Sequence, residues 1–595
     1  MTSANLRILA FSLAMIAASP ALAASFPLAP LPADRPWSGA SERLVAKRSD
    51  PWITPAEASG FATTPDYVAT RAWLERLAAA SPLLKIESFG TSPEGRDLYY
   101  VRASKGPGKP VLLAQGGIHS GEIDGKDAGL MLLRDIALRG KDGLLDKADL
   151  VFVPIFNVDG HERKSAYSRP NQRGPEMQGW RTTAQNLNLN RDYLKADAPE
   201  MQAMIGLIRK LDPALYLDLH VTDGADYQYD ITMGFVGWEG YYARSPAIGR
   251  WLDSRFRPAI ISALKREGHI PGLYVSGVDD RDPDKGIALG ADTPRFSTGY
   301  GDVARVPTVL VENHSLKNYR QRVLGTYVLV EAALKLVGDD AAGVAAAIAA
   351  DRASRPTETI IRWKPKSEPL YTTPFLGVTH DRYRSPASGR DEVRFGGKPV
   401  TLPMPVYGEE PALTITLPRA WWVPASATAV IERLKLHGVT FETIAAPMTL
   451  AVDMVRLVDP KLARADEGRV PLTAGFIHEK RTETFPAGSV RIPSDQPLAI
   501  LAAQLLEAES PDGALAWNFF PAILQRTEYM EAYVTAPMAD AMLERDPVLK
   551  ARFDAKLAAD PAFAANGAAR LAWFYAQTPY FDDRYLLYPV AREVD

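Results

Sequence analysis

The fold of this chain is decided by residues 111–128, which read Val111-Leu-Leu-Ala-Gln-Gly-Gly-Ile-His119-Ser-Gly-Glu122-Ile-Asp-Gly-Lys-Asp-Ala128. An apolar run, a glycine-rich turn and a polar helix start follow one another, which is typical of a strand that leads into a helix. His119 and Glu122 lie in the turn, at the strand end where open α/β folds place their sites. An imidazole and a carboxylate are two of the three protein ligands that a catalytic zinc needs.

Outward from this stretch, short apolar runs alternate with helical patterns. The further predicted strands are 150–155, 215–219 and 309–311, and the predicted helices are 123–138, 199–211, 245–267 and 318–337. Alternation of this kind predicts an α/β fold, with a mixed, mostly parallel central sheet flanked by helices.

Two of the apolar runs stop at a residue that can bind a metal or carry a proton. The run 215–219 ends at His220, and the run 308–311 ends at Glu312. A histidine at a strand end is often an ordinary polar terminus, and a glutamate there is often a surface residue or part of a salt bridge. The chain has no cysteine, so a zinc site must use histidine and carboxylate ligands. Together, His119, Glu122 and His220 form the predicted metal site.

Five motifs in a consistent order connect these residues to a known family. They are His119-Ser-Gly-Glu122, Asn157-Val-Asp-Gly160-His-Glu162, Trp180-Arg181, Asn190-Arg191 and Asp218-Leu-His220. From about residue 60 to 335, roughly half of the chain, the sequence resembles the carboxypeptidase A-like zinc peptidases.

The resemblance implies a zinc-dependent metallocarboxypeptidase, with one Zn2+ per chain held by His119, Glu122 and His220. It implies hydrolysis by water that the zinc activates, with Glu312 as general base and acid. The implied substrate is a peptide with a free C-terminal carboxylate.

The resemblance also implies the groups that bind the substrate. Arg181 polarises the scissile carbonyl and stabilises the oxyanion, while Asn190 and Arg191 hold the terminal carboxylate, for which a planar guanidinium is suited. Tyr300, between Gly299 and Gly301, matches a mobile tyrosine that closes over the substrate, although it stands closer to Glu312 than the family pattern has it. Tyr227, Tyr229 and Tyr319 are the alternatives for this tyrosine.

One departure from the family concerns residue 188. The family has an aspartate there, which accepts a hydrogen bond from the first ligand histidine, and this chain has Asn188. An amide oxygen can accept the same bond and hold the ring tautomer. Because the amide is neutral, we expect a more electrophilic zinc than with the family's aspartate. The departure leaves the zinc affinity and the pH optimum of the activity open.

The N-terminus indicates where the protein is located, and the net charge excludes some classes of partner. Arg7, the apolar run 8–18 and Ala21-Leu-Ala23 predict a signal peptide cleaved after Ala23, hence a secreted or periplasmic protein. No later segment is long and apolar enough to span a bilayer, so stable membrane insertion is not expected. A net charge of −3 does not indicate a protein that binds nucleic acid.

The expected organisation is a signal peptide (1–23), an irregular lead-in (24–55), a catalytic domain (56–338) and a C-terminal accessory region (339–595). The accessory region is expected to contain a β-rich part (356–460) and a mixed, helical part (461–595), with helices at 538–557 and 567–577. We expect it to pack on the catalytic domain and narrow access to the cleft. His380, His437 and His478 lie there without ligand spacing and are interpreted as structural.

The sequence leaves other functions and the side-chain specificity open. The alternatives are a related zinc amidase or deacylase, a hydrolase of γ-linked cell-wall peptides, and an inactive metal-containing binding protein. Asp302 would favour basic terminal side chains and Arg305 acidic ones. The oligomeric state is not determined by the sequence.

Overall fold

The strand–turn–helix pattern folds into an eight-stranded mixed sheet with the order β1-β2-β4-β3-β5-β9-β6-β7. The computed structural model describes residues 28–593, so the predicted signal peptide lies outside the described residues. The strands are β1 (Leu84–Thr91), β2 (Asp97–Ala103), β3 (Val111–Gly116), β4 (Asp149–Val153), β5 (Leu215–Val221), β6 (Ile231–Gly234), β7 (Pro271–Leu273) and β9 (Thr308–Asn313). The central strands β4, β3, β5 and β9 are parallel neighbours, whereas β1, β2 and β6 join the sheet through antiparallel pairs. The predicted α/β fold is confirmed.

The central strands are buried on both faces because helices cover both sides of the sheet. Every residue of β3, β4 and β5 is buried, as expected for a parallel sheet between two helical layers. Along β3, Leu112 belongs to one hydrophobic cluster and Leu113 to another, because successive side chains of a strand point to opposite faces.

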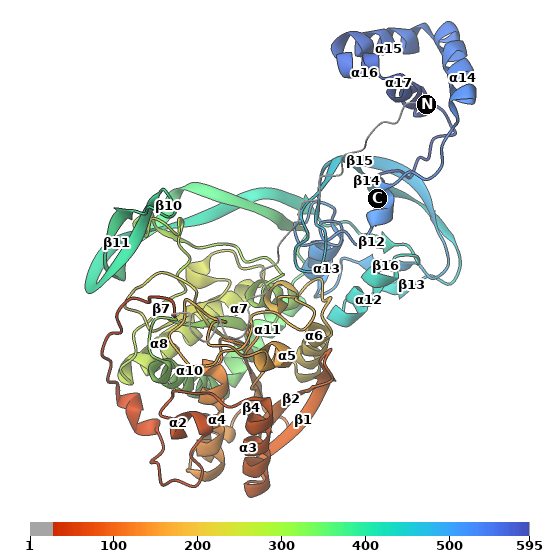
Figure 1. Cartoon of the computed structure of the whole chain (residues 1–595). Helices are drawn as coiled ribbons and strands as arrows, with labels where there is room; N and C mark the ends of the chain where they lie inside the picture. The colour runs from red at the N-terminus through yellow and green to blue at the C-terminus, as the bar shows by residue number, and fades with distance from the viewer. Residues whose placement is uncertain (1–27, 594–595) are drawn as a thin grey trace, which may run out of the picture.

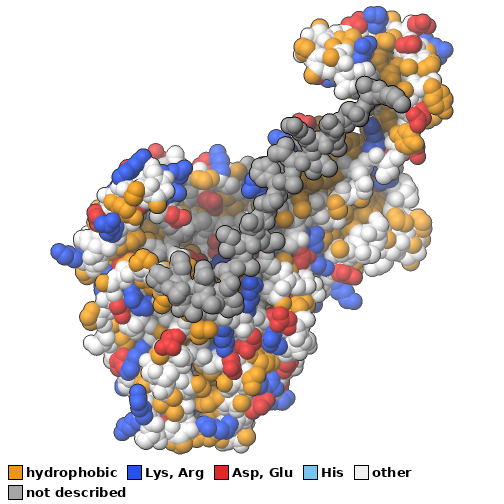
Figure 2. Space-filling model, in the orientation of Figure 1, with side chains coloured by type: hydrophobic (Ala, Val, Ile, Leu, Met, Phe, Trp, Pro, Cys, Tyr) orange, Lys and Arg blue, Asp and Glu red, His pale blue; other side chains and the backbone are white. Residues whose placement is uncertain are grey.

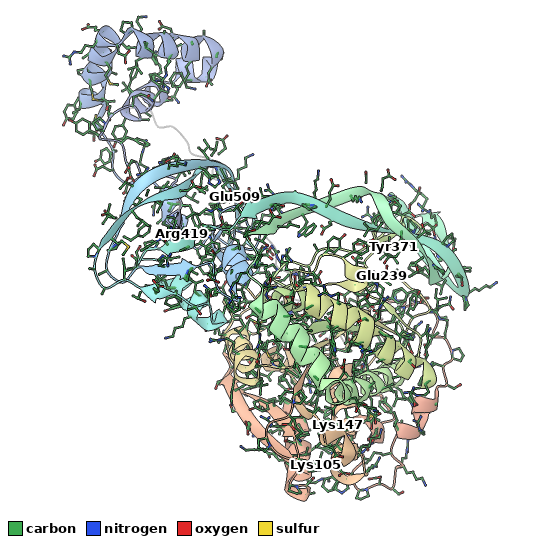
Figure 3. The ribbon with its side chains drawn as sticks, turned by 180° about the vertical axis from the view of Figure 1, so that it is seen from behind. Lys105, Lys147, Glu239, Tyr371, Arg419 and Glu509 are labelled. Atoms are coloured by element: carbon green, nitrogen blue, oxygen red, sulfur yellow. The ribbon has the colours of Figure 1, made fainter. Side chains whose placement is uncertain are left out.

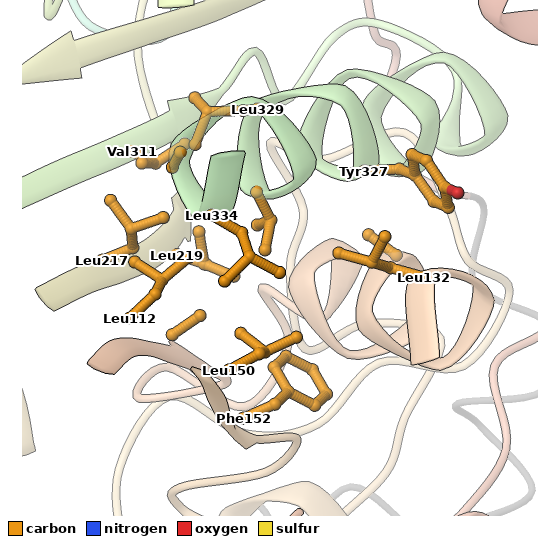
Figure 4. Packing of buried hydrophobic residues seen from close by; sticks show 14 of the residues in the cluster. Leu112, Leu132, Leu150, Phe152, Leu217, Leu219, Val311, Tyr327, Leu329 and Leu334 are labelled. Carbon is orange, nitrogen blue, oxygen red and sulfur yellow. The ribbon is translucent and has the colours of Figure 1, made fainter. Parts of the chain in front are cut away.

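The first of these clusters lies between the sheet and the helices α3 (Tyr67–Ala80), α4 (Asp124–Leu138), α8 (Arg257–Arg266) and α10 (Tyr319–Asp339). Figure 4 shows Leu112, Leu150 and Leu217 of the sheet packed toward Leu334 of α10. On the other face α6 (Pro199–Leu211) covers the sheet. The remaining helices of this part are α2 (Pro55–Ala58), α5 (Val158–Glu162), α7 (Pro246–Trp251), α9 (Ser297–Ala304) and α11 (Ala341–Ala353).

A long antiparallel hairpin, formed by β10 (Glu358–Arg384) and β11 (Asp391–Thr416), follows α11. In Figure 1 it extends as an arm over the catalytic part. The short strand β8 (Ile287–Ala288) pairs with β11. In Figure 3, Tyr371 of β10 lies beside Glu239. The rings of Tyr371 and Tyr241 are stacked, with their centres 6.4 Å apart. The arm is therefore packed on the catalytic part through aromatic contacts.

A second sheet of six strands follows the hairpin, in the order β13-β16-β12-β17-β14-β15. Its strands are β12 (Ala420–Val423), β13 (Glu442–Thr443), β14 (Met448–Leu462), β15 (Leu472–Phe485), β16 (Val490–Pro493) and β17 (Ala591–Glu593), accompanied by α12 (Thr428–His437) and α13 (Ala499–Leu506). Residue 460 lies inside β14, so the sheet runs across the expected division at that position. Side chains such as Trp421 and Leu434 share one hydrophobic cluster with Leu113 and Ile205 of the catalytic part.

The last helices form a small separate cluster at the far end of the molecule in Figure 1. They are α14 (Ala532–Arg545), α15 (Pro547–Ala559), α16 (Pro561–Ala565) and α17 (Gly567–Tyr575). The prediction of one helix over 538–557 is wrong, because the helix stops at Asp546. Asp546 caps α15, and Pro547 occupies the first turn of the new helix, where proline is tolerated because its missing N–H is not needed.

The surface carries both signs of charge, and on the face in Figure 2 lysine and arginine side chains are interspersed with aspartate and glutamate. Between residues 28 and 593, no helix has the length and apolar character that crossing a membrane requires.

Candidate active site and metal centre

Three adjacent parallel strands bring the predicted site residues together. Strand β3 leads into the turn with His119 and Glu122, and β5, its neighbour, carries His220. Strand β9 pairs with β5 in a register that sets Glu312 directly opposite His220. The carboxyl ends of parallel strands share one edge of a sheet, which explains how residues up to 193 positions apart meet (312 − 119 = 193).

The turn after β3 depends on two glycines. Gly117 has a φ of +70°, a conformation that glycine adopts without steric cost. A Cβ at Gly121 would lie 2.5 Å from Cγ of Arg169 and 2.9 Å from the carbonyl oxygen of Gly179. Gly121 therefore lets the segments that carry Arg169 and Arg181 approach the turn closely.

His119, Glu122 and His220 form a compact buried cluster. Nδ1 of His119 lies 2.9 Å from Oε1 of Glu122, and Nδ1 of His220 lies 2.9 Å from Oε2 of the same carboxylate. One ligand atom from each residue lies within 4.8 Å of the others. The predicted ligands thus converge on one point with their Nδ1 and carboxylate oxygen atoms.

The outer nitrogens of both histidines lie close to polar side chains. Nε2 of His119 lies 3.0 Å from Oδ1 of Asn188, so the amide provides the acceptor that the sequence led us to expect. Nε2 of His220 lies 3.0 Å from Oδ2 of Asp218. The hydrogen bond to Asn188 favours a proton on Nε2 of His119 and leaves its Nδ1 free as a ligand. For His220 the contact with Asp218 is an ion-pair distance without hydrogen-bond geometry.

The electrostatics of the cluster fit a cation. Burial lowers the pKa of His119, which favours its neutral, ligating form. Burial also lowers the pKa of His220, but the carboxylates of Asp218 and Glu122 outweigh it and raise this pKa well above its usual value. The pKa of Glu122 lies well below its usual value despite burial, because His119 and Arg169 favour the carboxylate. The carboxylates that favour a proton on His220 would equally favour a metal ion.

Three ligands with imidazole and carboxylate donors match a catalytic zinc site, in which a fourth position stays open for water. A closed structural site would need a fourth protein ligand, and the cluster found in residues 28–593 has three. The residues present therefore fit zinc.

Glu312 has the environment of a proton-transfer group. It is buried, and its Oε2 has no hydrogen-bond partner among the described residues. Burial raises the pKa of Glu312 to about 8, and the neighbouring charge of Glu122 acts in the same direction. A divalent cation at the ligands would lower this pKa, since an opposite charge favours the carboxylate.

Arg181 lies at the rim of the cluster, where it is one-third exposed. Its Nη1 is 3.5 Å from Oε1 of Glu122 and 3.3 Å from Oδ2 of Asp223. Arg169, which the sequence analysis did not single out, lies deeper, 3.0 Å from Oε1 of Glu122 and 2.7 Å from Oδ1 of Asp223. Arginine is frequent in any sequence, so nothing local distinguished Arg169 before folding brought it to the turn.

Asn190 and Arg191 lie in a single 3-10 turn, η3 (Leu189–Arg191), capped by the side chain of Asn188. Oδ1 of Asn190 has no hydrogen-bond partner in the described part of the chain. The guanidinium of Arg191 lies 4.5 Å from the centre of the Phe296 ring. Burial and the charge of Arg181 lower the pKa of Arg191.

The expected mobile loop around Tyr300 is a helix. Tyr300 lies in α9, is 3% exposed, and its hydroxyl is 3.1 Å from Nδ1 of His437. Gly301 packs against Thr308 and Val306, so Tyr300 is held in the core in this structure, and its movement over a substrate stays a prediction. His437, interpreted as structural, holds Tyr300 in place.

Tyr274 is a tyrosine that, like Tyr227, is influenced by the charge of Glu312. The charge of Glu312 and burial raise its pKa above the usual value, and Glu122 adds to this effect. Of the alternatives, Tyr227 packs against His314 at 4.1 Å and Tyr319 is buried. Tyr274 was missed because it follows β7, a three-residue strand with no pattern in the sequence.

Asp302 and Arg305 do not face a substrate pocket. Oδ1 of Asp302 accepts a hydrogen bond from the backbone of Ser245 at 2.7 Å, and Nη1 of Arg305 donates to the carbonyl of Arg244 at 2.6 Å. Both side chains are buried. The expectation that either one selects the terminal side chain of a peptide is therefore wrong.

The comparison with known proteins agrees with the sequence motifs and the site. Residues 70–233 match the family of zinc carboxypeptidases. Carboxypeptidase 2 of Trichophyton rubrum is 23% identical over 486 residues, which cover 76% of this chain and 83% of that protein. Among solved structures, the metallo-carboxypeptidase from Burkholderia cenocepacia aligns over 46% of this chain and 69% of its own, at 17% identity and a TM-score of 0.34.

Carboxypeptidase Z of Mus musculus is 32% identical over 216 residues, which cover 34% of this chain and 29% of that protein. The match thus spans less than a third of the mouse protein. The α/β sheet and the His-Glu-His cluster at its edge define the class of zinc metallopeptidases. The family match over residues 70–233 and the similarity to Carboxypeptidase 2 and Carboxypeptidase Z support a metallocarboxypeptidase that is similar to the carboxypeptidase A-like enzymes.

Proposed function

We propose that this protein removes C-terminal residues from peptides, using one zinc ion held by His119, Glu122 and His220. The observation that carries the proposal is the convergence of these three side chains beside Glu312 on adjacent parallel strands. A zinc ion held there would act as a Lewis acid toward the scissile carbonyl and toward water.

The side chains around the ligands supply the other steps of peptide hydrolysis. Glu312 takes a proton from the attacking water and returns it to the leaving amine, a role for which its free Oε2 is available. Arg181 donates hydrogen bonds to the carbonyl oxygen as negative charge develops on it. Its one-third exposure leaves it accessible to a peptide that enters the cleft.

Asn190 and Arg191 bind the terminal carboxylate of the peptide. The short turn η3 fixes their spacing, and the bond from Nη1 of Arg191 to its neighbour's carbonyl, at 2.7 Å, orients the guanidinium. A guanidinium and an amide are donors that suit a carboxylate. The requirement for a free carboxylate distinguishes this function from that of a zinc amidase or deacylase.

We further propose that residues 56–338 form the catalytic domain and that the accessory region packs over it and narrows the cleft. The continuous hydrophobic cluster between the two parts supports this arrangement. Export through the signal peptide 1–23 remains part of the proposal.

The test uses the purified chain, its metal content and a pair of peptides that differ only in a free or amidated C-terminus. We expect about one zinc per chain, hydrolysis of the free peptide alone, and loss of hydrolysis with a chelator. Glu312→Gln should retain zinc and lose about 10²- to 10⁴-fold in kcat, whereas Glu176→Gln, at an exposed site, should behave as wild type. Equal cleavage of both peptides would favour an amidase, and full activity of Glu312→Gln would remove Glu312 from the mechanism.

A further inference from the structure

The turn between β14 and β15 of the accessory sheet reaches into the wall of the active site. Oε2 of Glu467, in this turn, accepts a hydrogen bond from the backbone N–H of Asn188 at 2.8 Å, across 279 residues of sequence. Glu467 has a φ of +47°, which is uncommon for a residue other than glycine. A Cβ on the adjacent Gly468 would lie 2.6 Å from Cδ2 of Leu187, so the turn is pressed closely against the catalytic segment.

Asn188 also contacts residues at the centre of the site. Its Oδ1 lies 3.0 Å from Nε2 of His119 and accepts a hydrogen bond from the backbone N–H of Asn190 at 3.0 Å. One side of residue 188 therefore faces the accessory sheet, and the other orients a zinc ligand and the start of the carboxylate-binding turn. The negative charge of Glu467 also acts on Arg191, where it partly offsets the lowering of the pKa by burial.

The position of the turn is fixed by strong contacts on its other side. Nε and Nη2 of Arg469 bind Asp197 at 2.6 and 2.7 Å, a bidentate pairing that restricts geometry as well as adding energy. Arg433 of α12 binds the same aspartate at 3.1 Å, and the guanidinium of Arg469 lies 3.6 Å from the centre of the Phe519 ring. Glu467 is thus presented by a rigid support.

We propose that Glu467 is a positioning residue that the accessory sheet contributes to the active site, where it holds the Asn188–Arg191 turn in the conformation that orients His119 and Arg191. Without this acceptor, the N–H of Asn188 loses its partner and the turn can relax, taking the side chain of Asn188 with it. The inference deepens the proposed function and rests on it for the roles of His119 and Arg191.

The test compares four full-length variants with the wild type. Glu467→Ala removes the acceptor, Glu467→Asp draws it back by one methylene, and Glu467→Gln keeps an acceptor oxygen at the same reach. Asp466→Ala is the matched control, because Asp466 is exposed in the same turn and the change in charge is the same. The readouts are zinc release to a chromogenic chelator, amide hydrogen exchange in residues 187–191, and KM for a peptide with a free carboxylate.

We expect Glu467→Ala and Glu467→Asp to release zinc about tenfold faster, to exchange faster in residues 187–191 and to raise KM. Glu467→Gln and Asp466→Ala should stay within twofold of the wild type in zinc release and exchange. Wild-type rates in Glu467→Ala and Glu467→Asp would overturn the inference, and so would a Glu467→Gln variant as impaired as Glu467→Ala. Zinc release and exchange need no turnover, so a wild type that binds zinc and cleaves no peptide would refute the proposed function alone.

Discussion

Replacement of Asn188 by alanine tests the support of the zinc ligand directly. The change removes Oδ1, which faces two donors, Nε2 of His119 and the N–H of Asn190, each at 3.0 Å. Both residues are at most 9% exposed, so water cannot replace the lost acceptor freely. Each unsatisfied buried donor costs about 1–3 kcal/mol, which gives a loss of roughly 2–6 kcal/mol in the free energy of unfolding. Loss of an outer partner of a metal-binding histidine also lowers zinc affinity by about 10- to 100-fold.

The assay combines denaturant unfolding of the metal-free protein with zinc affinity from competition with a chelator. Asn188→Asp keeps both acceptor interactions and adds a negative charge next to His119, so it should bind zinc more tightly than the wild type. Asn171→Ala, at an exposed position, controls for the loss of an asparagine. An ordinary surface substitution changes the free energy of unfolding by up to about 0.5 kcal/mol. If Asn188→Ala changes it by no more than this and keeps a zinc affinity within twofold of the wild type, the reasoning about this support is refuted.

Substitutions at Tyr300, Tyr274 and Arg181 and a change of pH test other parts of the site and of the core. Tyr300→Phe should lower the free energy of unfolding by about 1–3 kcal/mol, because it leaves Nδ1 of buried His437 without a partner, and it should leave kcat almost unchanged. Tyr274→Phe should instead reduce kcat/KM. The reverse pattern in steady-state kinetics would restore Tyr300 to the mechanism. Burial lowers the pKa of His314 and of His437 to about 4. Below about pH 6.5, the usual histidine pKa, the unfolded chain therefore binds more protons than the folded chain, and the free energy of unfolding should fall by about 3 kcal/mol for each residue between about pH 6.5 and pH 4. Thermal unfolding that shows no decrease in stability across this range would contradict the prediction. Arg181→Ala should reduce kcat by about 10²- to 10³-fold with little change in melting temperature, since the side chain is one-third exposed, and a larger loss of stability than of kcat would make Arg181 a structural residue.

The central sheet and the three candidate metal ligands could be predicted from the amino-acid sequence. Strands β3, β5 and β9 have local apolar patterns, and each ends at, or leads into, a residue with a specific chemistry, so the pattern alone places His119, His220 and Glu312 at one edge of the sheet. The acceptor role of the Asn188 amide was expected from the resemblance to the carboxypeptidase A-like family, which has an aspartate at that place. The meeting of these strand ends needs only the periodicity of side chains and the common direction of parallel strands, whereas the roles of the residues come from the family resemblance.

Which of the remaining side chains lie near the site depends on the packing of the folded chain. Tyr300 has the glycine neighbours of a mobile residue, but packing against the accessory region buries it, and Asp302 is likewise held by a distant backbone segment. Arg169 and Glu467 reach the site through contacts across 47 and 279 residues (169 − 122 = 47). Local sequence patterns report which face of a strand or helix is apolar, whereas the approach of two distant loops depends on the packing of the whole chain, so these residues could be recognised only in the folded protein.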